Sequence, residues 1–201
     1  MKLYKEEDIK EIKNDLLKGK TIAFGTDTVF GLACIYDDPK AIKKVFKAKK
    51  RDTNKSLPMM CANFRMLNKV AYTNKDIKKI MKAYMPGPLT IIFKKKDTIN
   101  DYVTSGKDTI GIRIPNDKWI LNLIKEVDKP LLVTSANLSN EEALFKWQDV
   151  KAKLGKNIDG LVCKDARGDK ASTIIDCSNE KIKLLRKGPI SFKDILKVVK
   201  E

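Results

Sequence analysis

The 201-residue sequence contains no histidine. This absence excludes every catalytic arrangement that depends on an imidazole, including the Ser-His-Asp triad, the Cys-His pair and the HExxH zinc site. Any chemistry must therefore rest on charges, hydroxyl groups, backbone amides or a metal held by oxygen ligands.

Long apolar runs and paired cysteines are also missing. No apolar run approaches the length of a membrane span, and the first residues do not resemble a signal peptide. The cysteines form neither a CxxC pair nor a zinc spacing, so we interpret them as small buried hydrophobes in a reducing compartment. They are Cys34, Cys61, Cys163 and Cys177. We expect a cytoplasmic protein without membrane association.

Glycine-rich phosphate loops, aromatics and arginine are scarce or absent. Neither GxxxxGKS/T nor GxGxxG occurs. Only 7% of residues are aromatic, and no aromatic stripe alternates with basic residues, as RNA-binding surfaces often require. Arginine offers a planar, bidentate donor, so the few arginines are candidate contacts for phosphate or carboxylate. Three of them, Arg51, Arg113 and Arg186, fall inside candidate motifs.

Positive charge is abundant. The 42 basic and 26 acidic residues give a net charge of +16, which predicts attraction to polyanions such as nucleotides or RNA. A general preference for lysine on solvated helix faces would also explain much of this charge. With 42% apolar residues the chain can build a core, and its length fits one domain, 1–201.

Apolar periodicity and turn residues predict alternating helices and strands. This alternation indicates an α/β domain. Pro58 confines its strand to a sheet edge or to the strand's first residues. Helices are expected at 5–18, 39–51, 63–71, 74–84, 117–127 and 146–154 and after Ser191, and strands at 21–24, 57–61, 89–93, 110–114, 130–133, 160–163, 172–176 and 183–186.

Four polar clusters occur where predicted strands or helices end, at 26–28, 49–54, 134–137 and 172–173. Ligands in α/β proteins bind on loops beyond strand ends. Hydroxyls, an amide and cations without a general base suit the binding and orientation of an anionic substrate. Each cluster alone has a structural explanation, such as a helix cap or a basic last turn. Their joint occurrence favours a binding site.

In their order, these motifs resemble the YrdC-like family of threonylcarbamoyl-AMP synthases. The resemblance extends over nearly the whole chain. The matching stretches are TDTVFGL at 26–32, KKR at 49–51, PGPLT at 86–90, GIRIP at 111–115, TSANLS at 134–139 and STIID at 172–176.

The resemblance implies a fold and a reaction. The fold would be a twisted, mixed α/β sheet with flanking helices and a basic concave cavity. The reaction would convert L-threonine, bicarbonate and ATP into threonylcarbamoyl-AMP and pyrophosphate. A partner transferase would then move the threonylcarbamoyl group to tRNA. Aligning reactants and neutralising phosphate charge need no histidine.

The resemblance also implies residue roles. Thr28, Arg113 and Ser172 would bind L-threonine, with Arg113 holding its carboxylate as a bidentate fork. Lys49 and Arg51 would be the catalytic cations that neutralise bicarbonate and the ATP phosphates. Mg²⁺ would accompany ATP, although no carboxylate cluster predicts a metal site built by the protein. The ATP-binding residues would be Lys49, Arg51, Thr109, Ser135, Asn137 and Arg186.

The chain departs from the family pattern at several positions. Asp52 stands where proline is common, Met60 where many members carry histidine, and Ala171 where glutamate is common. Lys187-Gly188-Pro189 replaces the usual proline-glycine after Arg186. We expect the short form of the family, without the extra C-terminal domain of longer members.

A second hypothesis comes from a different class of protein. The basic concave face could bind tRNA or ribosomal RNA without catalysis. Binding through diffuse charge would fall steeply with salt and would barely depend on Ser135. An enzyme would need Lys49, Arg51, Ser135 and Asn137 specifically.

Overall fold

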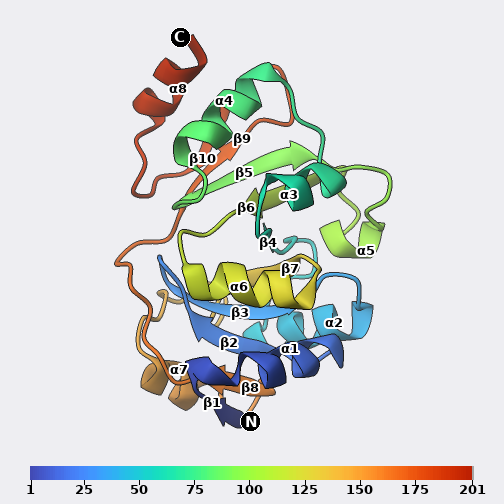
Figure 1. Cartoon of the computed structure of the whole chain (residues 1–201), viewed down its shortest axis with the longest axis vertical. Coiled ribbons are helices and arrows are strands. Elements are labelled where there is room, and N and C mark those ends of the chain that lie inside the picture. The colour runs from blue at the N-terminus through green and yellow to red at the C-terminus, as the bar shows by residue number, and fades with distance from the viewer. Residues whose placement is uncertain (201) are drawn as a thin grey trace.

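The computed structural model describes residues 1–200 and centres on a mixed sheet of ten strands (Figure 1). Their order across the sheet is β1-β8-β2-β3-β7-β4-β6-β5-β9-β10. The sheet confirms the expected α/β class. The strands are β1 Lys2–Tyr4, β2 Ile22–Gly25, β3 Phe30–Ile35, β4 Met59–Met60, β5 Leu89–Lys94, β6 Thr109–Arg113, β7 Leu131–Ser135, β8 Gly160–Val162, β9 Thr173–Asp176 and β10 Lys183–Arg186.

Helices flank the sheet. In Figure 1, α1 and α6 lie in front of the lower strands and pack against each other, whereas α4 and α8 pack together at the upper end. No helix within residues 1–200 is long and apolar enough to cross a membrane. After the 3₁₀ helix η1 Glu6–Asp8, the α-helices are α1 Ile9–Leu17, α2 Pro39–Lys49, α3 Phe64–Val70, α4 Lys75–Tyr84, α5 Asp101–Thr104, α6 Lys118–Val127, α7 Trp147–Leu154 and α8 Phe192–Lys200.

Local sequence explains where α2 begins and ends. The Asp38 side chain accepts hydrogen bonds from the backbone N–H groups of Lys40 and Ala41, and Pro39 occupies the first helical turn. The helix ends at Lys49, and the next residue, Lys50, adopts the left-handed conformation with a φ of 49°. The side chains of Lys49 and Arg51, on either side of Lys50, therefore leave the helix end in different directions.

The sheet differs from the sequence prediction in its centre. Strand β3 was not predicted, because all six of its residues are buried and it shows no polar–apolar alternation. The predicted strand at 57–61 shrinks to the two residues of β4, which pairs with β6 and β7. Of the two placements allowed by Pro58, the sheet edge is therefore wrong, and the start of the strand holds. Pro58 is tolerated because it lies just before β4 and only accepts a hydrogen bond, from the backbone N–H of Val133.

A buried carboxylate links α1 to β1 and makes stability depend on pH. Asp15 accepts a hydrogen bond from the Tyr4 hydroxyl and pairs with Lys20 at 2.9 Å. Burial alone would raise the pKa of Asp15, but these partners hold it below its ordinary value. Because the folded-state pKa is lowered, the ionised carboxylate stabilises the fold above its unfolded pKa of about 4. This contribution is lost as the pH falls through the lower folded-state pKa.

We therefore expect Asp15→Asn to destabilise the protein at pH 7, with the difference from wild type shrinking by pH 3. Urea unfolding of both proteins at the two pH values measures this difference in the free energy of unfolding. An unchanged difference would show that ionisation of Asp15 does not contribute.

Candidate active site

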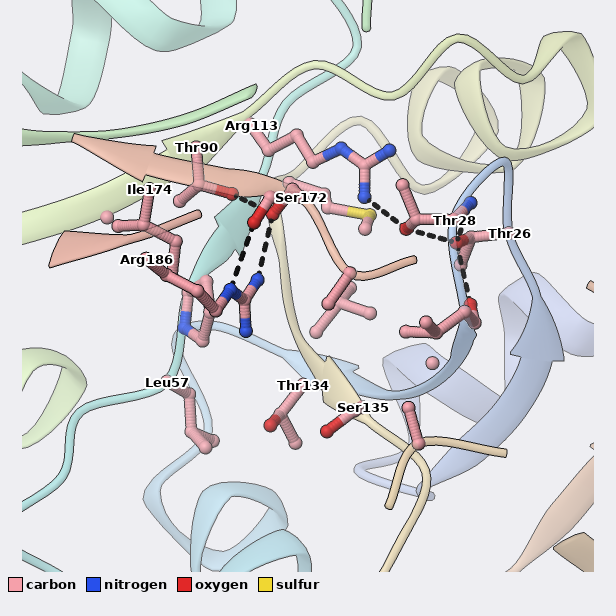
Figure 2. A pocket seen from close by; sticks show the side chains of 18 of the residues that line it. Thr26, Thr28, Leu57, Thr90, Arg113, Thr134, Ser135, Ser172, Ile174 and Arg186 are labelled. Atoms are coloured by element: carbon pink, nitrogen blue, oxygen red, sulfur yellow. Dashed lines mark hydrogen bonds between the residues drawn. The ribbon is translucent and has the colours of Figure 1, made fainter. Parts of the chain in front are cut away.

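A cavity of about 500 Å³ lies against the central strands, and its size is typical of small-molecule sites (Figure 2). Its lining comes from segments far apart in the chain: the β2–β3 loop, the loop after α2, strands β4 to β7, and the β9–β10 hairpin. Three of the five arginines line it, namely Arg51, Arg113 and Arg186, whereas Glu141 is the carboxylate among the lining residues. This excess of cations favours an anionic ligand.

The β2–β3 loop places two threonine hydroxyls at one end of the cavity. The Thr26 hydroxyl donates to the backbone oxygen of Val29 at 2.7 Å and accepts from the backbone N–H of Thr28 at 3.0 Å. The two hydroxyl oxygens lie 3.0 Å apart. These bonds close a tight polar turn that fixes the Thr28 hydroxyl (Figure 2).

The segment between β8 and β9 packs over this loop. The backbone N–H of Arg167 donates to the Thr26 carbonyl at 2.8 Å. A Cβ at Gly168 would lie 2.5 Å from the Thr28 Cα, so only glycine permits this approach. The loop is therefore held from two sides.

Arg113, at the end of β6, is 4% exposed and is already surrounded by acceptors. Its Nη1 donates to the Thr28 hydroxyl at 2.6 Å and its Nε donates to the Gly87 carbonyl at 2.9 Å. Its Nη2 lies 2.7 Å from Asp27 Oδ1, without hydrogen-bond alignment. A ligand carboxylate would thus meet the remaining Nη1 hydrogen, whereas Nη2 is buried beside Asp27.

Arg113 remains protonated although it is buried. Burial lowers the pKa of Arg113, and the Asp27 carboxylate opposes that shift. An arginine guanidinium is not deprotonated in proteins, so Arg113 keeps its charge at neutral pH.

Arg186 and Ser172 form a second polar group in the cavity (Figure 2). Arg186 donates through Nε to the Ser172 carbonyl at 2.9 Å and through Nη2 to the Ser172 hydroxyl at 3.1 Å. The Ser172 and Thr90 hydroxyls lie 2.8 Å apart. Burial, followed by the like charge of Arg113, lowers the pKa of Arg186, and both guanidiniums line the same cavity. Within the described chain, Nη1 of Arg186 has no hydrogen-bond partner, which leaves it available to a ligand.

Arg51 and Ser135 bring further unused donors to the cavity. Arg51 donates through Nε to the Lys55 carbonyl at 2.9 Å and through Nη2 to the Ser56 carbonyl at 3.1 Å, which leaves Nη1 without a partner among residues 1–200. The Ser135 hydroxyl also lacks a partner in that part of the chain, and Figure 2 shows Ser135 beside Thr134 on the opposite side of the cavity from Arg113. An anion between these groups would receive hydrogen bonds from several elements.

The structure brings together most of the site residues predicted from sequence. Seven of them line the one cavity: Thr28, Arg51, Arg113, Ser135, Asn137, Ser172 and Arg186. Lys49 and Thr109 do not line it. Lys49 is 1% exposed and lies beneath the segment that carries Ser135. Thr109 shares a face of β6 with Gly111 and Arg113, but each two-residue step along a strand covers about 6.6 Å, and the cavity stops at Gly111.

Sequence reasoning missed several residues that shape the cavity. Asp27 lies in the predicted polar cluster at 26–28, but no role was assigned to it, whereas its carboxylate faces Arg113. Thr26, Thr90 and Gly111 also line the cavity. Thr90 and Gly111 lie in motifs that could have indicated them, but no local signal connects Asp27 with a residue 86 positions away in the chain.

A protein-built metal site does not fit these residues. No group of three His, Cys, Asp or Glu side chains able to hold a metal ion occurs within residues 1–200. Octahedral oxygen ligation of Mg²⁺ would therefore have to come mainly from water and from the ligand's own phosphates.

Comparisons with known proteins agree on one family. The profile of the Sua5/YciO/YrdC family, described as "Telomere recombination", matches residues 14–188. A Methanocaldococcus jannaschii protein, provisionally named threonylcarbamoyl-AMP synthase, is 36% identical over 97% of this chain and 95% of its own length. The Pyrococcus abyssi threonylcarbamoyl-AMP synthase is 32% identical over 92% of this chain and 55% of its own length.

A solved structure is similar over nearly the whole chain. The crystal structure of P. abyssi Sua5 complexed with L-threonine superimposes with a TM-score of 0.91 and 29% sequence identity. The match covers 98% of this chain and 59% of the Sua5 chain, so the sequence spans somewhat more than half of the Pyrococcus protein.

Proposed function

The chain belongs to the Sua5/YciO/YrdC family, and we propose that it is a threonylcarbamoyl-AMP synthase. Its substrates are L-threonine, bicarbonate and ATP, and its products are threonylcarbamoyl-AMP and pyrophosphate. A relative of nearly equal length carries this name, and a close structural relative binds L-threonine. The names of these relatives do not favour the alternative of a non-catalytic RNA-binding module.

One observation carries the proposal: three arginines from three separate segments surround one cavity that also contains fixed threonine and serine hydroxyls. Such a cavity can hold several anions together, as threonine carboxylate, bicarbonate and triphosphate require. It offers no imidazole base, since the chain has no histidine. Catalysis would consist of alignment and charge neutralisation.

The proposed reaction has two steps. The threonine amine attacks the bicarbonate carbon, and loss of water gives a carbamate. A carbamate oxygen then attacks the α-phosphorus of ATP, and pyrophosphate leaves. The second step places extra negative charge on the phosphates, which guanidinium groups stabilise.

We assign the threonine end of the cavity to Thr28 and Arg113, which share a hydrogen bond, and to Ser172, as the family resemblance implies. The nucleotide and bicarbonate would lie toward Arg51, Ser135 and Arg186, whose donors have unused capacity. Mg²⁺ would enter with the ATP phosphates. In this proposal the chain is one domain over 1–201 that works in the cytoplasm and passes its product to a tRNA threonylcarbamoyl transferase.

Arg51→Ala tests the proposal. We expect wild-type protein to release pyrophosphate from ATP and bicarbonate only when L-threonine is present. In the variant this rate should fall at least about tenfold, which corresponds to about 1.4 kcal/mol of lost transition-state stabilisation. Arg65→Ala is the matched control, because Arg65 is exposed on α3 and does not line the cavity.

Threonine-independent release by wild type would contradict the proposed reaction. Equal rates for Arg51→Ala and Arg65→Ala would leave the reaction standing but would remove Arg51 from the site.

A further inference from the structure

The Lys49 ammonium is buried and its hydrogen-bonding capacity is used within the protein. It donates to the Ser135 carbonyl, to the Asn137 carbonyl at 2.5 Å and to Asn137 Oδ1 at 3.3 Å. A lysine ammonium has three N–H donors and no acceptor. All three donors therefore point at one segment, and none points into the cavity.

The Asn137 side chain completes this arrangement. Both hydrogens of its Nδ2 have acceptors, the Leu138 carbonyl at 2.9 Å and the Glu141 carbonyl at 2.8 Å. The backbone adds a return contact, because the Ser139 N–H donates to the Lys49 carbonyl at 2.9 Å. We call the segment 135–141 the Ser135 turn. The Lys49 side chain and carbonyl, at the end of α2, and the Asn137 amide hold this turn through these hydrogen bonds.

The side of the Ser135 turn that borders the cavity has unused hydrogen-bonding capacity. The Ser135 hydroxyl borders the cavity without a partner in the described chain, and Arg51 reaches the same cavity with a spare Nη1. Lys49 and Arg51 leave the end of α2 in different directions because Lys50 between them adopts the left-handed conformation. The two neighbouring cations therefore have separate tasks.

We propose that Lys49 and Asn137 are positioning residues, which hold the Ser135 turn so that the Ser135 hydroxyl contacts the nucleotide, while Arg51 makes the direct cationic contact. This inference rests on the proposed function, and it changes the roles that family resemblance gives to Lys49 and Asn137. A direct contact between Lys49 and a phosphate would require its ammonium to leave three acceptors and would leave the Ser135 and Asn137 carbonyls unpaired and buried.

The protonation state agrees with a role as a hydrogen-bond donor. Burial, followed by the charge of Arg51, lowers the pKa of Lys49 to about 8. The amine is therefore mostly protonated at pH 7, where it can serve all three acceptors.

Two readouts on Lys49→Met separate the proposal from a direct phosphate contact. The first is amide hydrogen exchange of the Ser135 turn without any ligand, which reports local opening. We expect exchange at 135–141 to accelerate at least about tenfold in Lys49→Met and to stay at the wild-type rate in Lys47→Met, whose exposed lysine lies in the same helical turn. Exchange at the wild-type rate in Lys49→Met would mean that the ammonium does not hold the turn.

The second readout is a double-mutant cycle for ATP affinity, measured by calorimetry on wild type, Lys49→Met, Ser135→Ala and the double variant. If Lys49 acts through the Ser135 hydroxyl, the double variant binds ATP about as weakly as the weaker single variant. Multiplicative losses would overturn the proposal, and so would unchanged exchange in the ligand-free protein.

A second variant and a check on the proposed function complete the test. If Lys49→Met does not fold, Asn137→Ala provides the same two readouts, because it removes the amide contacts and leaves the ammonium in place. Should wild type bind no ATP, the proposed function fails, while the exchange experiment still decides whether Lys49 holds the turn.

Discussion

Replacing Arg113 by lysine is expected to reduce threonine-dependent pyrophosphate release by at least about a hundredfold. The guanidinium serves the Thr28 hydroxyl, the Gly87 carbonyl and the Asp27 carboxylate from three different nitrogens. A lysine ammonium has one nitrogen and cannot reach all three. The substitution would weaken the pairing with the partly buried Asp27 carboxylate and would release the Thr28 hydroxyl and the Gly87 carbonyl. Each polar group left without its partner loses a hydrogen bond.

Steady-state kinetics with varied L-threonine measure this effect, and thermal unfolding checks the fold. Arg65→Lys is the matched control, because it makes the same exchange at an exposed position on α3. A wild-type rate in folded Arg113→Lys would remove Arg113 from the threonine end of the cavity.

Replacing Gly111 by leucine is expected to weaken ligand binding strongly, because the side chain would occupy part of the cavity. A Cβ at Gly111 would meet Ile92 at 3.0 Å, Thr90 at 3.6 Å and Pro58 at 4.0 Å, and all of these residues line the cavity. The longer leucine side chain would therefore extend into the ligand's space. We expect at least about a hundredfold weaker ATP binding, which corresponds to about 2.8 kcal/mol.

Gly111→Ala separates occlusion from damage to β6. One methyl group needs only a small movement of the flexible Ile92 end, so alanine should retain ATP binding within about tenfold. Calorimetric titration of both variants gives the comparison. ATP binding by Gly111→Leu at wild-type affinity would show that the ligand occupies a different place.

Sequence patterns predicted the elements that carry one-sided or local signals. Asp38 and Pro39 mark the start of α2, and the alternation in β6 places Arg113 on the face opposite Ile112. Strand β3 gave no such signal, because all six of its residues are buried and no polar residue alternates with them. Strand β4 has two residues, too few for any periodic pattern.

The site was predictable as a set of motifs but not as a set of contacts. Alternation gives the face on which Thr109 lies, yet it does not say how far along β6 the cavity extends. The residues at 47–51 are compatible both with a basic helix end and with a ligand site. In the structure, Lys49 donates to carbonyl groups of a neighbouring segment, whereas Arg51 lines the cavity. The partners of Arg113 come from 27, 28 and 87, positions that only the fold brings together.

The most direct test of the account is isolation of its product. Protein incubated with ATP, carbon-13 bicarbonate and nitrogen-15 L-threonine should yield a compound that contains AMP and both labels, identified by rapid-quench mass spectrometry, and the compound should be missing with Arg113→Lys. Pyrophosphate release with neither label attached to AMP would contradict the proposal that this cavity joins threonine, bicarbonate and ATP.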